Sequence, residues 1–124
     1  MRLWHQDLLD KLPRQQLLGQ HRECCALRGN GWGRKHATVD YVFTYNPVRL
    51  ITYHFLVMNV MDTRGYKNVD YKWFGGEYRG KNCIEKFSLD YDEKIDTNRI
   101  FPEHNDEYMA ECLENLSKKG VNLQ

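Results

Sequence analysis

The stretch that decides the fold is residues 46–65, which read NPVRLITYHFLVMNVMDTRG. Asn46 is a good N-cap, and Gly65 can adopt the left-handed conformation that ends many helices. Between these two residues, apolar side chains are spread around most of the helix circumference, which is typical of a helix covered on several sides. We therefore expect a central, largely buried helix in which Phe55 and Met58 belong to the core.

Two further helices are expected, over residues 13–29 and from about residue 104 to residue 119. The first begins with a proline and ends at a glycine, and it has an apolar stripe of leucines and cysteines with Gln20 among the polar residues of the opposite face. The second has acidic residues early and lysines late, as the helix dipole favours. His54 in the central helix is expected to be a core histidine with a neighbouring hydrogen-bond partner rather than a catalytic group.

The pattern as a whole predicts an all-α fold, a compact single domain of residues 1–124 with three main helices. Its length fits one domain, because compact domains usually have ~100–150 residues. Residues 66–101 are expected to form a long ordered loop before the last helix. Alternation of apolar and polar residues over positions 87–91 is too short to indicate a strand with a partner.

Charge is distributed unevenly along the chain, although the net charge is only +1. Residues 1–81 carry 13 Lys and Arg against 7 Asp and Glu, and residues 82–124 carry 5 against 10. A clustered basic surface attracts polyanions, so the first two-thirds of the chain indicates an anionic partner. The alternative is a dipolar surface in which the acidic part packs near the basic part.

Several other classes are disfavoured by the sequence. No apolar run approaches the ~18–20 residues of a membrane span and the first residues lack a signal-peptide pattern, so we expect a cytoplasmic protein with no membrane partner. The spacing of Cys24, Cys25, Cys83 and Cys112 fits neither a zinc site nor a disulfide framework, and we expect reduced thiols. His21 lies in an HxE sequence, but the PCxxC half of a zinc deaminase is missing. We expect no metal, no other cofactor and no obligate protein partner.

Glu23 is the one acidic residue between positions 11 and 39. A carboxylate within a basic surface repels phosphate groups, so a purely phosphate-binding role does not account for it. On a helix, Gly19 and Ala26 would flank Glu23 along its own face, and their small side chains would let a substrate or another backbone approach the carboxylate. The alternative role is an ordinary ion pair with a neighbouring arginine.

Two loop segments have compositions suited to nucleic acid. Residues 29–36, GNGWGRKH, combine three alternate glycines with an aromatic ring and the potentially cationic side chains Arg34, Lys35 and His36, a combination suited to phosphate oxygens. Residues 71–81 mix aromatic and cationic side chains, which suits unstacked bases. The second segment fits a lid over the hydrophobic core equally well.

The sequence of residues 15–23, QQLLGQHRE, followed by RKH at 34–36, resembles the first helix and basic loop of the pyrimidine-dimer DNA glycosylases, the phage-type endonuclease of ultraviolet-damage repair and its bacterial relatives. The resemblance is best over residues 1–36 and becomes fainter up to residue 66. It implies a compact all-α domain of three helices. It also implies that an extended N-terminal segment lies across the helices and brings the terminal amine near the glutamate.

The resemblance further implies a DNA repair glycosylase and abasic-site lyase that acts on pyrimidine dimers or related damaged bases through an imine intermediate. A free α-amine has a pKa of ~7.7–8, so a usable fraction is neutral and nucleophilic near pH 7. Because Arg2 is too large for normal removal of the initiator methionine, the attacking amine is expected to be that of Met1. Glu23 is expected to assist proton transfer and to stabilise the cationic intermediate.

The implied partner is damaged double-stranded DNA. The residues expected to contact it are Arg2, Gln15, Arg22, Arg34, Lys35 and His36. A non-catalytic nucleic-acid-binding module with the same fold is the alternative function.

Overall fold

The structure is a computed structural model that describes residues 2–28, 41–42, 45, 47–67 and 97–123. Its elements are a short 3-10 helix η1 (Gln6–Leu8) and the α-helices α1 (Arg14–Arg28), α2 (Pro47–Thr63) and α4 (Asp106–Lys118). The described part of the chain contains three α-helices and no strand, so the predicted all-α class is confirmed. None of these helices combines the length and apolar character needed to cross a membrane.

The observed helix ends lie within two residues of the predicted ones. The Asn105 side chain caps α4 by accepting a hydrogen bond from the backbone N–H of Tyr108 at 2.9 Å. Gly65 and Gly120 follow α2 and α4 with φ values of 78° and 83°, a conformation that costs glycine little because it has no Cβ. The basic loop at 29–36, the aromatic segment at 71–81, the pattern at 87–91 and Cys83 lie outside the described residues.

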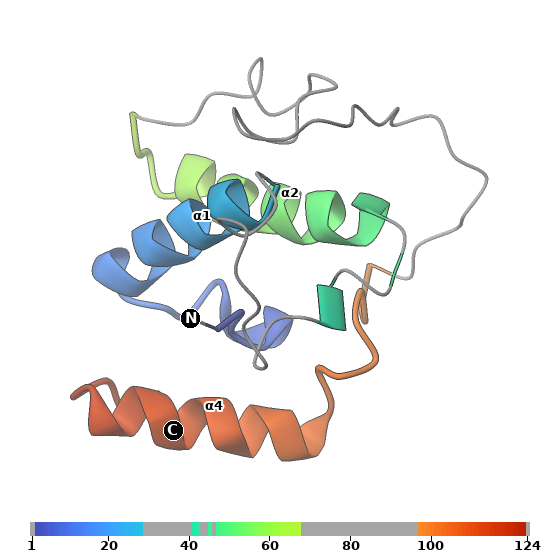
Figure 1. The fold of residues 1–124 in the computed structure, drawn as a ribbon. Helices are drawn as coiled ribbons and strands as arrows, with labels where there is room; N and C mark the ends of the chain where they lie inside the picture. Colours follow the sequence, from blue (N-terminus) through green and yellow to red (C-terminus); the bar gives the residue numbers. More distant parts are fainter. Residues whose placement is uncertain (1, 29–40, 43–44, 46, 68–96, 124) are drawn as a thin grey trace.

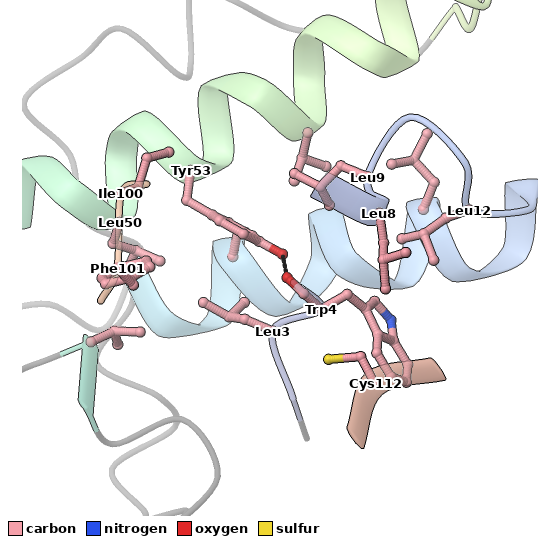
Figure 2. Packing of buried hydrophobic residues seen from close by; sticks show 14 of the residues in the cluster. Leu3, Trp4, Leu8, Leu9, Leu12, Leu50, Tyr53, Ile100, Phe101 and Cys112 are labelled. Carbon is pink, nitrogen blue, oxygen red and sulfur yellow. Dashed lines mark hydrogen bonds between the residues drawn. The ribbon is translucent and has the colours of Figure 1, made fainter. Parts of the chain in front are cut away.

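The N-terminal segment, residues 2–5, lies between the α1–α2 pair and α4 (Figure 1). It is followed by η1, and together these residues supply much of the core (Figure 2). The buried apolar residues in this part of the chain are Leu3, Trp4, Leu8, Leu9 and Leu12. The crossing segment implied by the resemblance is therefore present, with the helices packed on both sides of it.

The buried face of α2 is made by Tyr53, Val57, Met58 and Met61, which are fully buried. Phe55 is 45% exposed, so the expectation that it belongs to the core is wrong. It lies about one turn from Asn59, which is also exposed, on the side of α2 opposite the core. Apolar residues all around α2 predicted that every side of the helix would be buried. In the structure, the parts of the protein packed against α2 cover only part of its circumference.

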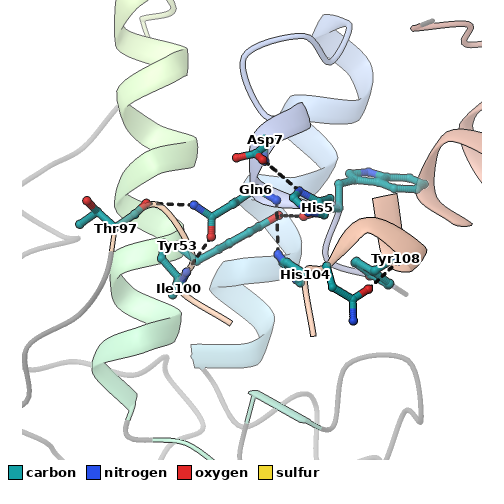
Figure 3. Close-up of polar contacts among 10 residues, drawn as sticks. His5, Gln6, Asp7, Tyr53, Thr97, Ile100, His104 and Tyr108 are labelled. Carbon is teal, nitrogen blue, oxygen red and sulfur yellow. Dashed lines mark hydrogen bonds and ion pairs between the residues drawn. The ribbon is translucent and has the colours of Figure 1, made fainter. Parts of the chain in front are cut away.

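Gln6 joins η1 to the stretch that precedes α4 (Figure 3). Its side-chain amide donates to the Thr97 carbonyl at 2.9 Å and accepts from the Ile100 N–H at 2.7 Å. Its backbone N–H donates to Nδ1 of His104 at 3.3 Å. The proton of the neutral His104 ring is therefore on Nε2, which lies 2.6 Å from the Tyr41 hydroxyl. These bonds attach the stretch before α4 to Gln6 and Tyr41, which lie far from it in the sequence.

Burial keeps the His104 ring neutral. The ring is 1% exposed, and desolvation, with a smaller contribution from His5, lowers the pKa of His104 to about 3. Burial also lowers the pKa values of His5, His21 and His54. All four histidines are therefore easier to protonate in the unfolded chain than in the folded protein.

Truncation of α2 should distinguish its buried and exposed faces. Met58→Ala should lower the free energy of unfolding by about 2–5 kcal/mol, because it leaves a cavity in the core. Phe55→Ala should cost about 1 kcal/mol or less, because much of the ring already contacts solvent. Urea unfolding measures both values, and equal destabilisation in the two variants would contradict the observed orientation of α2.

Acid should destabilise the protein through its buried histidines. As the pH falls from about 6.5 toward about 3, the unfolded chain binds a proton at position 104 that the folded protein excludes, which costs up to ~1.4 kcal/mol per pH unit for each such histidine. His104→Gln should make the free energy of unfolding fall less steeply as the pH is lowered, whatever its effect on stability at pH 7. Urea midpoints measured from pH 7 to pH 4 test this, and equal slopes for the variant and the wild type would show that His104 is not held neutral.

Candidate active site

A pocket of about 490 Å³ lies among the N-terminal segment, one face of α1 and the C-terminal half of α4. Its lining consists mainly of amide and cationic side chains around a single carboxylate, that of Glu23. The residues that line it are Arg2, Trp4, Gln15, Gln16, Gly19, Gln20, Arg22, Glu23, Asn115 and Lys119. The volume falls within the range of small-molecule sites, ~300–1,000 Å³, which is large enough for a nucleotide turned out of a duplex.

The helical spacing of α1 brings Glu23 to this pocket. Arg22 and Glu23 follow Gly19 by three and four residues, so both lie on the face of the helix that carries Gly19. A Cβ built on Gly19 would lie 3.7 Å from Nη2 of Arg22, an ordinary contact, so the Arg22 side chain lies close to the glycine. Gly19 thus borders the pocket together with Glu23, whereas Ala26, the other small residue expected beside Glu23, is not among the lining residues.

Gln20 attaches the N-terminal segment to α1. The Trp4 N–H donates to Oε1 of Gln20 at 2.6 Å, and Nε2 of Gln20 donates to the Arg2 carbonyl at 3.1 Å. Gln20 is only 1% exposed, so the expectation that it belongs to the polar outer face of the helix is wrong. Its amide is buried because its partners are the main-chain groups of the segment. Since Gln20 precedes Glu23 by three residues, residues 2–4 are fixed within one turn of the carboxylate.

Two tyrosines attach the same segment to the other helices. The Tyr53 hydroxyl of α2 donates to the Trp4 carbonyl at 2.6 Å (Figure 2). The same hydroxyl lies 2.8 Å from Oε1 of Gln20. The Tyr108 hydroxyl of α4 donates to the Leu3 carbonyl. Burial raises the pKa of both phenols, so they remain protonated donors at neutral pH. Each of the three helices therefore makes hydrogen bonds to the N-terminal segment.

Four of the residues predicted from the sequence line this one pocket: Arg2, Gln15, Arg22 and Glu23. Nη1 of Arg2 lies 2.9 Å from Oε1 of Glu111, so its guanidinium is ion-paired at the pocket wall. The remaining predicted residues, Met1, Arg34, Lys35 and His36, lie outside the described residues.

Five further pocket residues were not predicted from the sequence: Trp4, Gln16, Gln20, Asn115 and Lys119. Lys119 follows the C-terminal turn of α4, where the sequence explains a lysine through the helix dipole alone. The position of Lys119 in the pocket lining depends on how α4 packs, and no local signal in the sequence reports that packing.

His21, Cys25 and His54 form a second cluster, with possible ligand atoms within 4.8 Å of one another. Nδ1 of His21 is 2.9 Å from Nε2 of His54, and Nη1 of Arg28 is 3.1 Å from Nδ1 of His54. A guanidinium can only donate, so Nδ1 of His54 accepts and the proton of its neutral ring is on Nε2, directed at His21. Nε2 of His54 then carries a proton in place of the lone pair with which it would bind a metal ion. The geometry fits a hydrogen-bonded chain, and it confirms His54 as a core histidine with neighbouring partners.

Comparison with known proteins gives a family match. A family model described as pyrimidine dimer DNA glycosylase matches residues 1–73, well over half of the chain. No curated protein and no solved structure matches the chain.

Proposed function

The chain belongs to the pyrimidine dimer DNA glycosylase family, and on that premise we propose that it is a DNA repair glycosylase and abasic-site lyase with the amine of Met1 as nucleophile and Glu23 as the assisting carboxylate. The substrate would be duplex DNA that contains a pyrimidine dimer or a related damaged base. The pocket that contains Glu23 would receive the damaged nucleotide or its sugar.

The observation that carries the proposal is the attachment of residues 2–4 to the helix of Glu23. Met1 is covalently joined to Arg2, whose carbonyl accepts a hydrogen bond from Gln20. Relative to an amine on the second encoded residue, as in the phage enzymes, a retained methionine extends the chain by up to ~3.3–3.6 Å. Because main-chain groups of Arg2, Leu3 and Trp4 all have hydrogen-bond partners on the helices, only the dihedral angles on the N-terminal side of the Arg2 carbonyl would decide whether the amine reaches the sugar.

In the proposed reaction, the neutral amine forms a bond to C1′ of the damaged nucleotide, and the electron pair of the glycosidic bond leaves with the base. Glu23 accepts a proton from the bound amine, and the expelled base takes up a proton from water. The C1′–O4′ bond then breaks as the C1′–N double bond forms, and Glu23 returns its proton to O4′. The carboxylate stabilises the positive charge that develops on the sugar and on the imine. Loss of a C2′ proton then breaks the bond to the 3′ phosphate, and hydrolysis of the imine releases the enzyme. A carboxylate that repels phosphate groups is useful here because its target is a cation.

The basic residues around Glu23 would hold the DNA backbone. Arg22 on α1 and Lys119 just after α4 both line the pocket, and both are exposed. Together with Arg34 and Lys35 of the proposed DNA-binding loop, they would contact phosphate groups on either side of the damaged site. Gln15, also exposed in the pocket lining, would make polar contacts to the same strand.

The catalytic role of Glu23 is tested by Glu23→Gln, which keeps the size of the side chain and removes its charge. Strand cleavage on dimer-containing and abasic duplexes should fall by ~10²–10⁴-fold, the usual effect of losing general acid–base assistance. DNA affinity should hold or rise, because a charge that repels phosphate is removed. The control is Glu114→Gln on the exposed face of α4, which removes the same charge outside the pocket lining and should cleave normally.

Borohydride trapping separates the proposal from its rival. An imine-forming enzyme becomes covalently linked to abasic DNA, and mass spectrometry of the linked peptide should identify the amine of Met1. A wild-type protein that binds DNA, cleaves nothing and forms no covalent link would favour the non-catalytic binding module. Undiminished cleavage by Glu23→Gln would instead remove the catalytic role of the carboxylate and leave Glu23 as an ion-pair partner.

The salt dependence of binding tests the proposed phosphate interactions. Removal of one cation that neutralises a phosphate should lower the slope of log K against log salt by ~0.9, so Arg22→Ala and Lys119→Ala should each show this change and should bind more weakly at low salt. Lys118→Ala is the matched control, because Lys118 lies 3.6 Å from Glu114 and is not part of the pocket lining. Equal slopes for Lys119→Ala and Lys118→Ala would show that the DNA does not lie across this end of α4.

A further inference from the structure

We propose that Gln20 is a positioning residue for the amine nucleophile, because its side-chain amide fixes the register of the N-terminal segment on α1. The inference rests on the function proposed for the pocket, in which the amine of Met1 attacks. The hydrogen bonds of the Gln20 amide to the segment go to Arg2 and Trp4, so its influence on the amine would pass through residues 2–4.

The hydrogen bonds of Gln20 match those that one residue of a neighbouring strand makes in a parallel β-ladder. Its Oε1 accepts from the Trp4 N–H at 2.6 Å, and its Nε2 donates to the Arg2 carbonyl at 3.1 Å, so one amide binds the two main-chain groups that flank Leu3. A strand neighbour in a parallel sheet pairs with the same two groups of a residue. The side chain thus takes the place of a strand that the described part of the chain does not contain.

This pairing defines which main-chain groups of the segment meet α1, one turn before Glu23. A slip of one residue along the segment would place Arg2 or Trp4 at the buried position of Leu3, and neither side chain has its shape and apolar character. Leu3 is fully buried, and Gln20 itself is 1% exposed, so neither group can exchange its partner for water at low cost. The register of residues 2–4, and with it the start of the chain, is therefore coupled to one glutamine.

A glutamine is the side chain that satisfies both main-chain groups. A glutamate would offer only acceptors when ionised, and an asparagine is one methylene shorter. A methionine fills a similar space without either hydrogen bond. In Gln20→Met the hydrogen bonds from Tyr53 to Trp4 and from Tyr108 to Leu3 remain available, so we expect a folded protein in which the Arg2 end of the segment is released.

The test compares Gln20→Met with wild type by three measurements: hydrogen exchange of the Trp4 amide, affinity for abasic duplex, and the single-turnover rate of borohydride trapping on saturating abasic duplex. Exchange at Trp4 should accelerate because its acceptor is removed. The trapping rate should fall by ~10–100-fold, since a displacement of about 1 Å at a reacting group can cost 10²-fold. Affinity should stay near that of wild type, because Gln20 itself is 1% exposed and the Arg2 guanidinium keeps its ion pair with Glu111, and saturating duplex makes the trapping rate insensitive to a small change.

The matched control is Met61→Ala, a fully buried truncation in α2 that is not part of the pocket lining. It should lower the melting temperature, yet its trapping rate and its Trp4 exchange under native conditions should match wild type. This separates positioning from general stability. If Gln20→Met does not fold, Gln20→Asn, which keeps an amide but is too short to bind both groups, replaces it with the same expectations.

The outcomes separate the positioning role from the proposed function. The positioning role is overturned if hydrogen exchange at Trp4 is unchanged in the Gln20 variant, or if that variant traps abasic DNA at the wild-type rate. Either result leaves the proposed function intact. A wild-type protein that traps no abasic DNA overturns the proposed function and the positioning role with it. Slow trapping by Gln20→Met with normal affinity and normal trapping by Met61→Ala supports both.

Discussion

The structure depends on supplying partners to the main chain of a segment that passes through its interior. Residues 2–5 lie between α1–α2 and α4, where the described part of the chain offers no neighbouring strand. Buried N–H and C=O groups are costly without hydrogen bonds, and three side chains from three different helices provide them: Gln20, Tyr53 and Tyr108. The helices are consequently arranged around the segment, and the face of α1 that carries Glu23 is brought beside the start of the chain.

The helices and their ends could be predicted because their signals are local. Cap residues such as Gly65 act through their own dihedral angles, and the period of apolar residues reports a helix wherever it lies. What failed was the direction in which particular side chains point. Phe55 is as apolar as its buried neighbours, but it lies on the uncovered side of α2, and Gln20 is polar but buried by main-chain partners. Both outcomes depend on neighbours far away in the sequence.

The candidate site also has a part that could be predicted from the sequence and a part that could not. Glu23 could be singled out because a lone carboxylate in a basic stretch is visible in the sequence. The contribution of α4, through Asn115 and Lys119, could not be predicted, because it follows from the packing of the last helix against the N-terminal segment. The electrostatic character of the pocket is set by both parts. Cations on α1 and after α4 surround one carboxylate, an arrangement that attracts a polyanion and still stabilises a cation at one point.

The attachment of the first residues to the last helix also has a consequence for the order of events during synthesis. Leu3 and Tyr108, which share a hydrogen bond, are separated by 105 positions. The segment leaves the ribosome before α4, so its hydrogen bond to α4 cannot form until residue 108 has also been made. Until then Leu3 and Trp4 are without a large part of their apolar surroundings, and closing so long a loop slows folding. Residues 2–4, which lead to the proposed nucleophile, thus gain their full set of hydrogen-bond partners only after α4 has been made.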